Sequence, residues 1–170
     1  METIYSDKII ADEIISDSFA SLFPELKLFK WDFIAQEPEG YDENNSNHII
    51  FNTSYIEDKI EFGFSINFFR TPLENSEERS LVIAKRFAKN LDCRILVSFT
   101  LPSNPQDPFY HLIIKNEDIY LADDSDTTFA DGTDWKVKIL KKIELSKNEF
   151  DSKGHLVKKE YLLPTKPKAH

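Results

Sequence analysis

The feature that most constrains the fold is a stretch over residues 59–69 in which apolar and polar side chains alternate strictly. Its apolar positions are Ile60, Phe62, Phe64, Ile66 and Phe68. A period of two places alternate side chains on opposite faces of an extended strand. One apolar and one polar face are typical of an antiparallel sheet covered on one side. The stretch therefore predicts an antiparallel strand with one buried face.

Two other segments carry the three-and-four spacing of helices. Within residues 76–91 the spaced apolar positions are Leu81, Ala84, Ala88 and Leu91. Asn75 and Glu78 have the spacing of a capping box, which predicts Asn75 as the N-cap. Residues 7–22 repeat isoleucine, phenylalanine and leucine at similar intervals, and Pro24 ends the segment. We predict two helices, over 7–22 and 76–91.

The rest of the chain reads as strands and turns. Further alternating segments are 27–35, 48–56, 93–101, 109–122 (a hairpin), 135–145 and 155–163. Strands and helices do not alternate regularly, which disfavours a doubly wound parallel sheet. We predict an α+β fold with a single, mostly antiparallel sheet of six to eight strands and two helices packed on one face. Residues 1–163 form one domain and 164–170 a frayed tail; a boundary near residue 134 is the alternative.

The charge of the chain limits its partners. It holds 21 Lys and Arg against 30 Asp and Glu, a net charge of −9 with a pI near 4.9. Such a chain is a poor nucleic-acid binder, because phosphate contacts need clustered basic charge. Residues 1–75 carry 5 basic and 15 acidic residues, whereas 135–170 carry 10 and 4. Either the basic end lies against acidic strands, or the protein presents a bipolar surface to a partner.

The composition also argues against familiar catalysis. Four glycines cannot build a phosphate-cradling loop or a dinucleotide fingerprint. The four histidines lack metal-ligand spacing, and the single cysteine excludes an intrachain disulfide. We therefore predict no enzyme activity, no cofactor and no metal. One catalytic alternative is a Cys93–His111 nucleophile–base pair, with Asp118 or Asp123 orienting the base.

The location follows from the absence of targeting signals in these residues. The first residues are acidic and lack the basic start and apolar run of a signal peptide. No apolar stretch approaches the roughly 20 residues of a membrane span. We expect a cytoplasmic protein without a membrane partner.

Two acidic loops are the strongest remaining signal for binding. The first contains Glu37, Glu39, Asp42 and Glu43, and the second contains Asp123, Asp124 and Asp126. Such loops either keep the surface solvated or imitate a phosphate backbone and occupy a basic cleft. Calcium binding is an alternative for 123–134, although the spacing does not match an EF-hand loop. We predict both loops as partner-binding sites.

Residues 84–124, AKRFAKNLDCRILVSFTLPSNPQDPFYHLIIKNEDIYLADD, carry a resemblance to a known family. The segment resembles the second half of small bacterial immunity proteins that accompany polymorphic and contact-dependent toxins. It covers about a quarter of the chain and carries no diagnostic motif, so no functional residue is transferred. The resemblance implies a cytoplasmic inhibitor that binds one cognate toxin domain, often a nuclease.

We therefore predict an immunity protein that neutralises a toxin domain with a basic surface by presenting an acidic surface to it. Two alternatives stay open. The order of elements is similar to that of small acidic secretion chaperones, which bind an extended client, although those end in a helix. The third possibility is a small enzyme with an unrecognised site.

Overall fold

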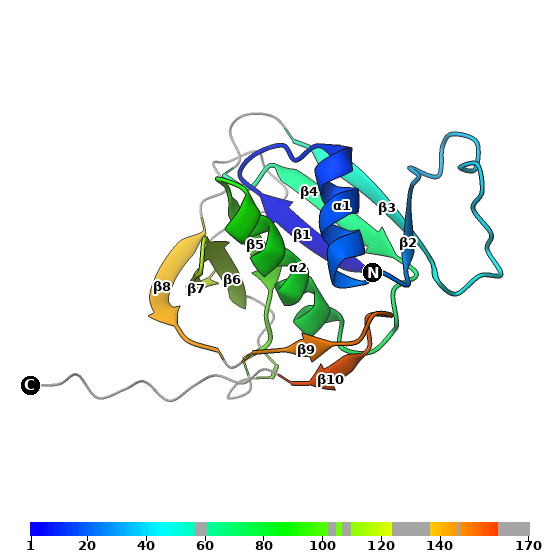
Figure 1. Cartoon of the computed structure of the whole chain (residues 1–170). Helices are drawn as coiled ribbons and strands as arrows, with labels where there is room; N and C mark the ends of the chain where they lie inside the picture. Colours follow the sequence, from blue (N-terminus) through cyan, green and yellow to red (C-terminus); the bar gives the residue numbers. More distant parts are fainter. Residues whose placement is uncertain (57–60, 102–104, 107–109, 124–136, 146, 160–170) are drawn as a thin grey trace, which may run out of the picture.

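The structure is a computed structural model that describes residues 1–56, 61–101, 105–106, 110–123, 137–145 and 147–159. Two helices and ten strands make up the described part of the chain (Figure 1). The helices are α1 (Asp12–Leu22) and α2 (Ser76–Asn90). The strands are β1 (Glu2–Ser6), β2 (Lys27–Lys30), β3 (His48–Tyr55), β4 (Phe64–Phe69), β5 (Arg94–Ser98), β6 (Tyr110–Lys115), β7 (Asp118–Asp123), β8 (Lys138–Ile143), β9 (Glu149–Phe150) and β10 (Leu156–Lys158).

The strands form one large sheet and one small hairpin. The large sheet has eight strands in the order β2-β3-β4-β1-β5-β6-β7-β8, and β9 pairs with β10 separately. Every pair in the large sheet is antiparallel except β2 with β3, which is parallel. The predicted α+β fold, with two helices and a mostly antiparallel sheet, is confirmed.

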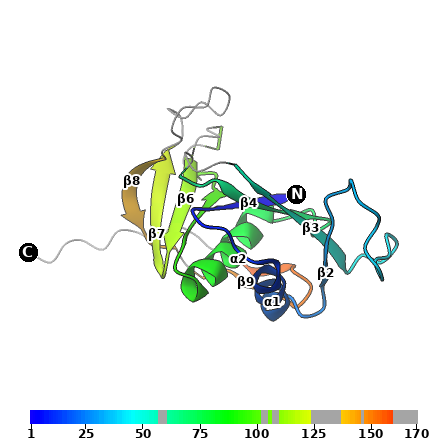
Figure 2. The ribbon, with the colours of Figure 1, turned by 90° about the horizontal axis from the view of Figure 1, so that it is seen from above.

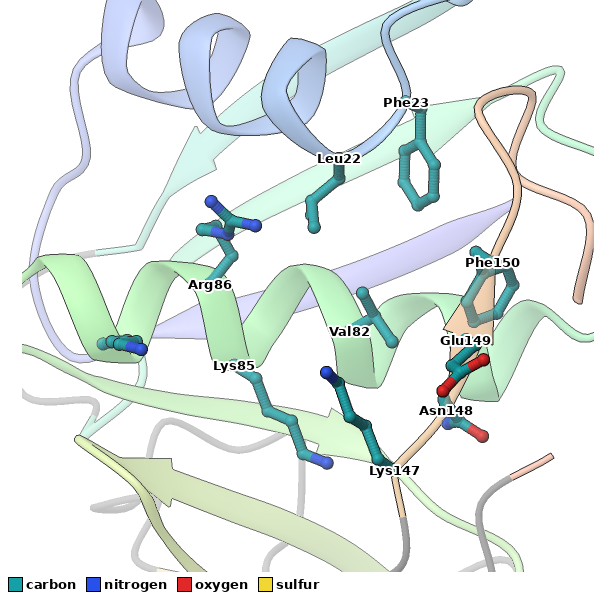
Figure 3. Close-up of a pocket in the computed structure, with 10 residues that line it drawn as sticks. Leu22, Phe23, Val82, Lys85, Arg86, Lys147, Asn148, Glu149 and Phe150 are labelled. Atoms are coloured by element: carbon teal, nitrogen blue, oxygen red, sulfur yellow. The ribbon is translucent and has the colours of Figure 1, made fainter. Parts of the chain in front are cut away.

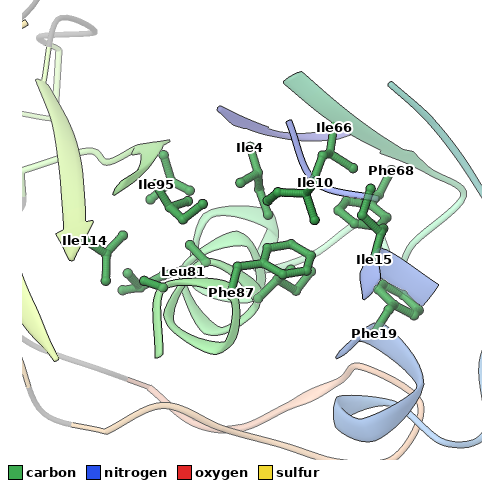
Figure 4. Close-up of a cluster of buried hydrophobic side chains, with 14 of the residues drawn as sticks. Ile4, Ile10, Ile15, Phe19, Ile66, Phe68, Leu81, Phe87, Ile95 and Ile114 are labelled. Atoms are coloured by element: carbon green, nitrogen blue, oxygen red, sulfur yellow. The ribbon is translucent and has the colours of Figure 1, made fainter. Parts of the chain in front are cut away.

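The main core lies between the helices and the sheet. Alternation along the strands brings Ile4, Ile66, Phe68, Ile95 and Ile114 into one buried cluster. Helix spacing brings Ile15 and Phe19 of α1, with Leu81 and Phe87 of α2, into the same cluster (Figure 4). The ring of Phe19 stacks on that of Phe68 with centroids 5.2 Å apart. Seen from above, α1 and α2 lie next to each other (Figure 2).

A smaller cluster occupies the opposite face, and it corrects the predicted strand over 59–69. Phe64 belongs to the main core, but Phe62 packs with Leu96 and Ile113 in the smaller cluster. The alternation therefore breaks at Gly63, and β4 begins only at Phe64; residues 57–60 lie outside the described residues. Glu61 explains the break, because its carboxylate binds the Arg94 guanidinium at 2.8 Å and the backbone N–H of Val137 at 3.2 Å.

The predicted helix over 7–22 is too long, and the strand before it is not predicted at all. The chain reaches α1 only at Asp12, while β1 lies between β4 and β5. Asp7 cannot join the helix, because its carboxylate accepts hydrogen bonds from the backbone N–H and the Nε of Arg94, at 2.8 and 3.0 Å. A contact between residues so far apart in sequence leaves no local pattern.

Other boundaries show the same limits of local patterns. The strand predicted over 27–35 ends at Lys30, and β8 covers only part of 135–145. Asn75 is the N-cap residue of α2, but its backbone is left-handed (φ 59°) and its side chain makes no capping hydrogen bond. The hairpin of β6 and β7 is present, as the sequence predicts. The predicted tail 164–170 lies outside the described residues.

A buried arginine joins the hairpin of β9 and β10 to the main body. The Nε of Arg79 lies 3.0 Å from Oε1 of Glu2, and both side chains are completely buried. Its terminal nitrogens donate to the carbonyl oxygens of Pro72, Glu74 and Gly154. Burial raises the pKa of Glu2, although the Arg79 charge opposes the rise. Arg79 thus connects β1, the β4–α2 loop and the β9–β10 turn.

Candidate functional site

The candidate site is loop 31–47, which connects the parallel strands β2 and β3. Because the strands are parallel, the chain must return to the start of β2, where the N–H of Lys27 donates to the carbonyl oxygen of Asn47 at 2.8 Å. The loop projects beyond the edge of the sheet in both views (Figures 1 and 2). It contains the first acidic segment predicted from the sequence.

A row of apolar residues on the sheet anchors the loop. Register places Phe29 of β2 beside Ile50 of β3, and Ile50 beside Phe69 of β4. Phe29 and Ile50 are buried yet belong to neither apolar cluster, and they alternate with Ile49 and Phe51 of the main core. The row therefore lies on the face opposite the main core, and the loop covers it.

The cover consists of aromatic rings in mutual contact. Phe33 meets Phe69 edge to face at 5.2 Å, and Trp31 lies 4.8 Å from Phe33. Tyr41 lies 5.8 Å from Trp31 and 5.6 Å from Phe29. Each such ring pair adds about 0.5–1.5 kcal/mol beyond the area that it buries. The rings hold the start of the loop against Tyr41 in its middle and against the sheet.

A tight turn at the start of the loop presents two apolar side chains. The carboxylate of Asp32 accepts hydrogen bonds from the backbone N–H groups of Ile34 and Ala35, both at 3.1 Å. Both hydrogen bonds lower the pKa of Asp32, and the bond from Ala35 has the larger effect. Trp31 Nε1 donates to the Ala35 carbonyl oxygen at 3.0 Å. The turn leaves Phe33 50% and Ile34 92% exposed.

Phe33 occupies this position with an unfavourable backbone conformation. Its φ is +65°, in the left-handed region that a bulky side chain rarely adopts. Such residues cost on the order of 1–3 kcal/mol and occur where the surroundings fix them, often at functional sites. The Asp32 turn and the ring contacts of Phe33 supply that fixation.

The acidic side chains follow the turn. Glu37, Glu39, Asp42 and Glu43 are all exposed, and none of the four forms an ion pair within the described part of the chain. The backbone beneath them is fixed: the N–H of Asp42 donates to His48 Nδ1 at 3.0 Å. Arg70 binds the Tyr41 hydroxyl and donates to the Glu43 carbonyl oxygen at 2.5 Å. The loop thus combines a fixed backbone with uncompensated negative charge.

The second predicted acidic loop lies elsewhere. Asp123 ends β7, opposite Tyr110 and Lys138, and five strands separate β7 from β2. Asp124 and Asp126 lie outside the described residues, as does most of the alternative calcium loop. The structure therefore does not bring Asp123 next to the first acidic loop.

The alternative Cys93–His111 pair is not formed. Cys93 is buried in the main core, just before β5. His111 lies opposite Ser98, at the other end of β5, on the face that carries Ile113. Five residues of strand separate the two positions by roughly 16 Å. Burial also raises the pKa of the Cys93 thiol, which disfavours a nucleophilic thiolate.

Sequence reasoning found the four carboxylates but missed the apolar half of the site. Trp31 and Phe33 were assigned to a strand, because their alternation with Asp32 imitates one. The signal that identifies the turn is Asp32 itself, since aspartate bonds backbone N–H groups two and three residues ahead. Nothing local identifies Arg70, whose partners lie 27 and 29 residues away.

Within the residues that the structure describes, no cluster of three or more His, Cys, Asp or Glu side chains is arranged to hold a metal ion. Neither described helix has the length and apolar character needed to cross a membrane. Comparison of the chain with protein-family models, curated proteins and solved structures gives no match.

Proposed function

We propose that the protein is an immunity-type inhibitor that binds one cognate toxin domain through loop 31–47. The observation that carries the proposal is the fixed turn that exposes Phe33 and Ile34 beside four carboxylates that form no ion pair with the described residues. Protein interfaces concentrate binding energy in a few apolar or aromatic anchors surrounded by a polar rim. The loop has both parts within one short segment.

The charges and the rigidity have separate roles in this proposal. Uncompensated carboxylates attract a basic partner and raise the rate of encounter. A loop already held in its bound shape loses little conformational entropy on binding, which lowers the dissociation rate. Arg70 and Asp32 hold that shape through backbone bonds, so they act as positioning residues.

The partner follows from the chemistry of the loop. It has a basic surface with an apolar pocket large enough for Phe33 and Ile34. A nuclease-type toxin domain fits this description, because a cleft that binds phosphate is basic. Blocking that cleft with carboxylates neutralises the toxin by competition for its substrate site.

The test is survival of cells that produce a toxin domain encoded beside this chain. Wild-type protein should protect them. A loop-neutralised variant, with Glu37→Gln, Glu39→Gln, Asp42→Asn and Glu43→Gln, should associate at least about tenfold more slowly at low salt and protect poorly. The matched control neutralises four exposed carboxylates elsewhere: Glu13→Gln, Asp17→Asn, Glu117→Gln and Glu144→Gln.

A second pair of variants tests the apolar anchors. Ile34→Ser should speed dissociation and lower protection, whereas Val157→Ser, at an exposed position on β10, should leave both unchanged. The proposal fails if no neighbouring toxin domain is neutralised. It also fails if the loop variants protect as well as their matched controls.

A further inference from the structure

The helix side of the molecule carries a groove that the proposed function does not use. It has a volume of about 540 Å³ and lies between the end of α1, the middle of α2 and the segment that leads into β9 (Figure 3). This volume is within the usual range of binding pockets, about 300–1,000 Å³. Its apolar lining comes from Leu22, Phe23, Val82 and Phe150. Phe23 and Phe150 meet edge to face at 6.1 Å.

The groove is basic, although the chain as a whole has a net charge of −9. Among its described lining residues are four cations, Lys85, Arg86, Lys89 and Lys147, and one carboxylate, Glu149. Figure 3 shows Lys85 and Arg86 on the α2 side, away from Phe23 and Phe150. The groove therefore has an apolar end and a cationic end. An occupant that suits it carries an apolar anchor next to several carboxylates.

Loop 31–47 has the complementary arrangement. Its turn exposes Phe33 and Ile34, and Glu37 and Glu39 follow within a few residues. The loop cannot reach the groove of its own chain, because Phe33 is held against Phe69 on the face opposite the main core. The groove is built on the helices, which pack on that core. A loop that enters the groove must come from another molecule.

We infer that a second copy of this chain is the occupant: loop 31–47 of one molecule docks in the α1–α2–β9 groove of another. Ile34 and the exposed side of the Phe33 ring enter the apolar end, and Glu37 and Glu39 meet Arg86 and Lys89. The contact joins two different surfaces of the chain, so it is either reciprocal within a pair or continues from copy to copy. The inference goes beyond the proposed function, and a docked loop is withheld from any other partner.

A charge-swap experiment on the purified protein tests this contact. The loop-reversed variant carries Glu37→Lys and Glu39→Lys, and the groove-reversed variant carries Arg86→Glu and Lys89→Glu. Sedimentation should show concentration-dependent association of the wild type. Each variant alone should associate at least about tenfold more weakly, since its loop and groove then carry the same sign.

The decisive sample is the equimolar mixture of the two variants. Their net charges change by the same amount in opposite directions, and each loop again faces a groove of opposite sign. Association should therefore return in the mixture. The inference is overturned if the wild type stays monomeric up to about 1 mM, if either variant associates as the wild type does, or if the mixture stays monomeric.

A cross-linking experiment locates the contact independently of charge. A copy with Ile34→Cys should form a disulfide with a copy carrying Val82→Cys in the groove under mild oxidation. The matched control is a copy with Lys158→Cys, an exposed position outside the groove. Equal or faster cross-linking to the control position overturns the inference. Neither experiment involves a toxin, so failure here leaves the proposed function to its own test.

Discussion

Loop 31–47 and the hairpin of β9 and β10 both lie outside the eight-stranded sheet, and opposite kinds of interaction hold them. The loop is held by rings that remain partly exposed, each contributing a modest amount. The hairpin is held by a guanidinium that is wholly buried with its carboxylate partner, together with the ring contact of Phe150 with Phe23 and a backbone bond from Glu25 to Ser152. Loss of one contact among many weak ones therefore removes little stability, whereas loss of one member of a buried ion pair leaves the other charge buried and removes much more.

The hairpin also depends on a glycine, as the loop does. Gly154 and Gly40 both have φ of +79°. Around Gly154 a Cβ would meet the side chains of Arg79, Leu26 and Phe23, whereas nothing lies near Gly40. The same backbone conformation therefore sits in a packed environment in one region and in open space in the other. Four predictions test how far the contrast holds.

The largest effect is expected from Arg79→Met. The substitution leaves Glu2 buried without its cation, a change that costs about 3–5 kcal/mol in other buried pairs. It also removes the one Arg79 donor, Nη1, that reaches the Gly154 carbonyl oxygen, at 3.4 Å. Urea unfolding measures the loss of stability. A loss below about 1 kcal/mol, the range of exposed ion pairs, would contradict the contrast.

Its control is the double variant Glu2→Leu with Arg79→Met. Replacing both partners by apolar side chains removes the unpaired charge, so part of the stability should return. The part that does not return reports the carbonyl bonds of Arg79 to Pro72, Glu74 and Gly154.

Phe29→Ala should have the next largest effect. Phe29 is nearly buried beneath the loop, and loss of such a ring costs about 3 kcal/mol, at the low end for core phenylalanines. Phe33→Ala, at a half-exposed ring, should cost about 1 kcal/mol or less. Urea unfolding compares the two variants. Equal losses would show that the loop is held as a single unit, like the hairpin.

The matched pair Gly154→Ala and Gly40→Ala should cost about 1–2 kcal/mol each, because both force alanine into the left-handed region. The part of the chain that loses stability should differ between the two variants. Hydrogen exchange should show Gly154→Ala lowering protection around Arg79, and Gly40→Ala lowering it only within loop 31–47. A global loss of protection in Gly40→Ala would break the comparison.

Lowering the pH should reduce the stability of both regions alike, and this effect should be the smallest of the four. In the loop, hydrogen bonds from the backbone N–H groups of Ala35 and Ile34 lower the pKa of Asp32. In the hairpin turn, hydrogen bonds from the backbone N–H groups of His155 and Lys153 lower the pKa of Asp151. The stability from these bonds is present above the ordinary pKa of 3.8 and is lost as pH falls through the lower folded value. The amide NMR shifts of Ala35 and His155 should titrate with midpoints below 3.8. A midpoint above that value would exclude the bonds in solution.

Local segments of this fold were predictable from the sequence, and long-range ones were not. The hairpin of β6 and β7 has alternating strands and a short polar turn at Asn116, so all of its information is local. The start of α2 after Asn75 was predictable for the same reason. In contrast, β1 is defined by partners around Ile66 and Leu96, which no local window contains.

The candidate site also has a part that local sequence predicts and a part that depends on long-range contacts. The carboxylates at Glu37 and Glu39 are evident from composition, because exposed acidic loops need no partner. The strand predicted over 27–35 would place Phe33 in an extended backbone, whereas its φ is +65° and its ring contacts Phe69 of β4. The surface chemistry was therefore predictable, and the shape that presents it was not.

The central position of β1 has a consequence for how the chain folds. Thr3 pairs with Asn67 and Tyr5 with Leu96, so β1 is synthesised long before either neighbour leaves the ribosome. In the described sheet, the five-residue strand β1 is hydrogen-bonded on one side to the half β2-β3-β4 and on the other to the half β5-β6-β7-β8. Pairings of such high contact order close slowly, because loop entropy is lost before the contacts form. We therefore expect the pairing of β1 with β4 and β5 to be a late step in folding.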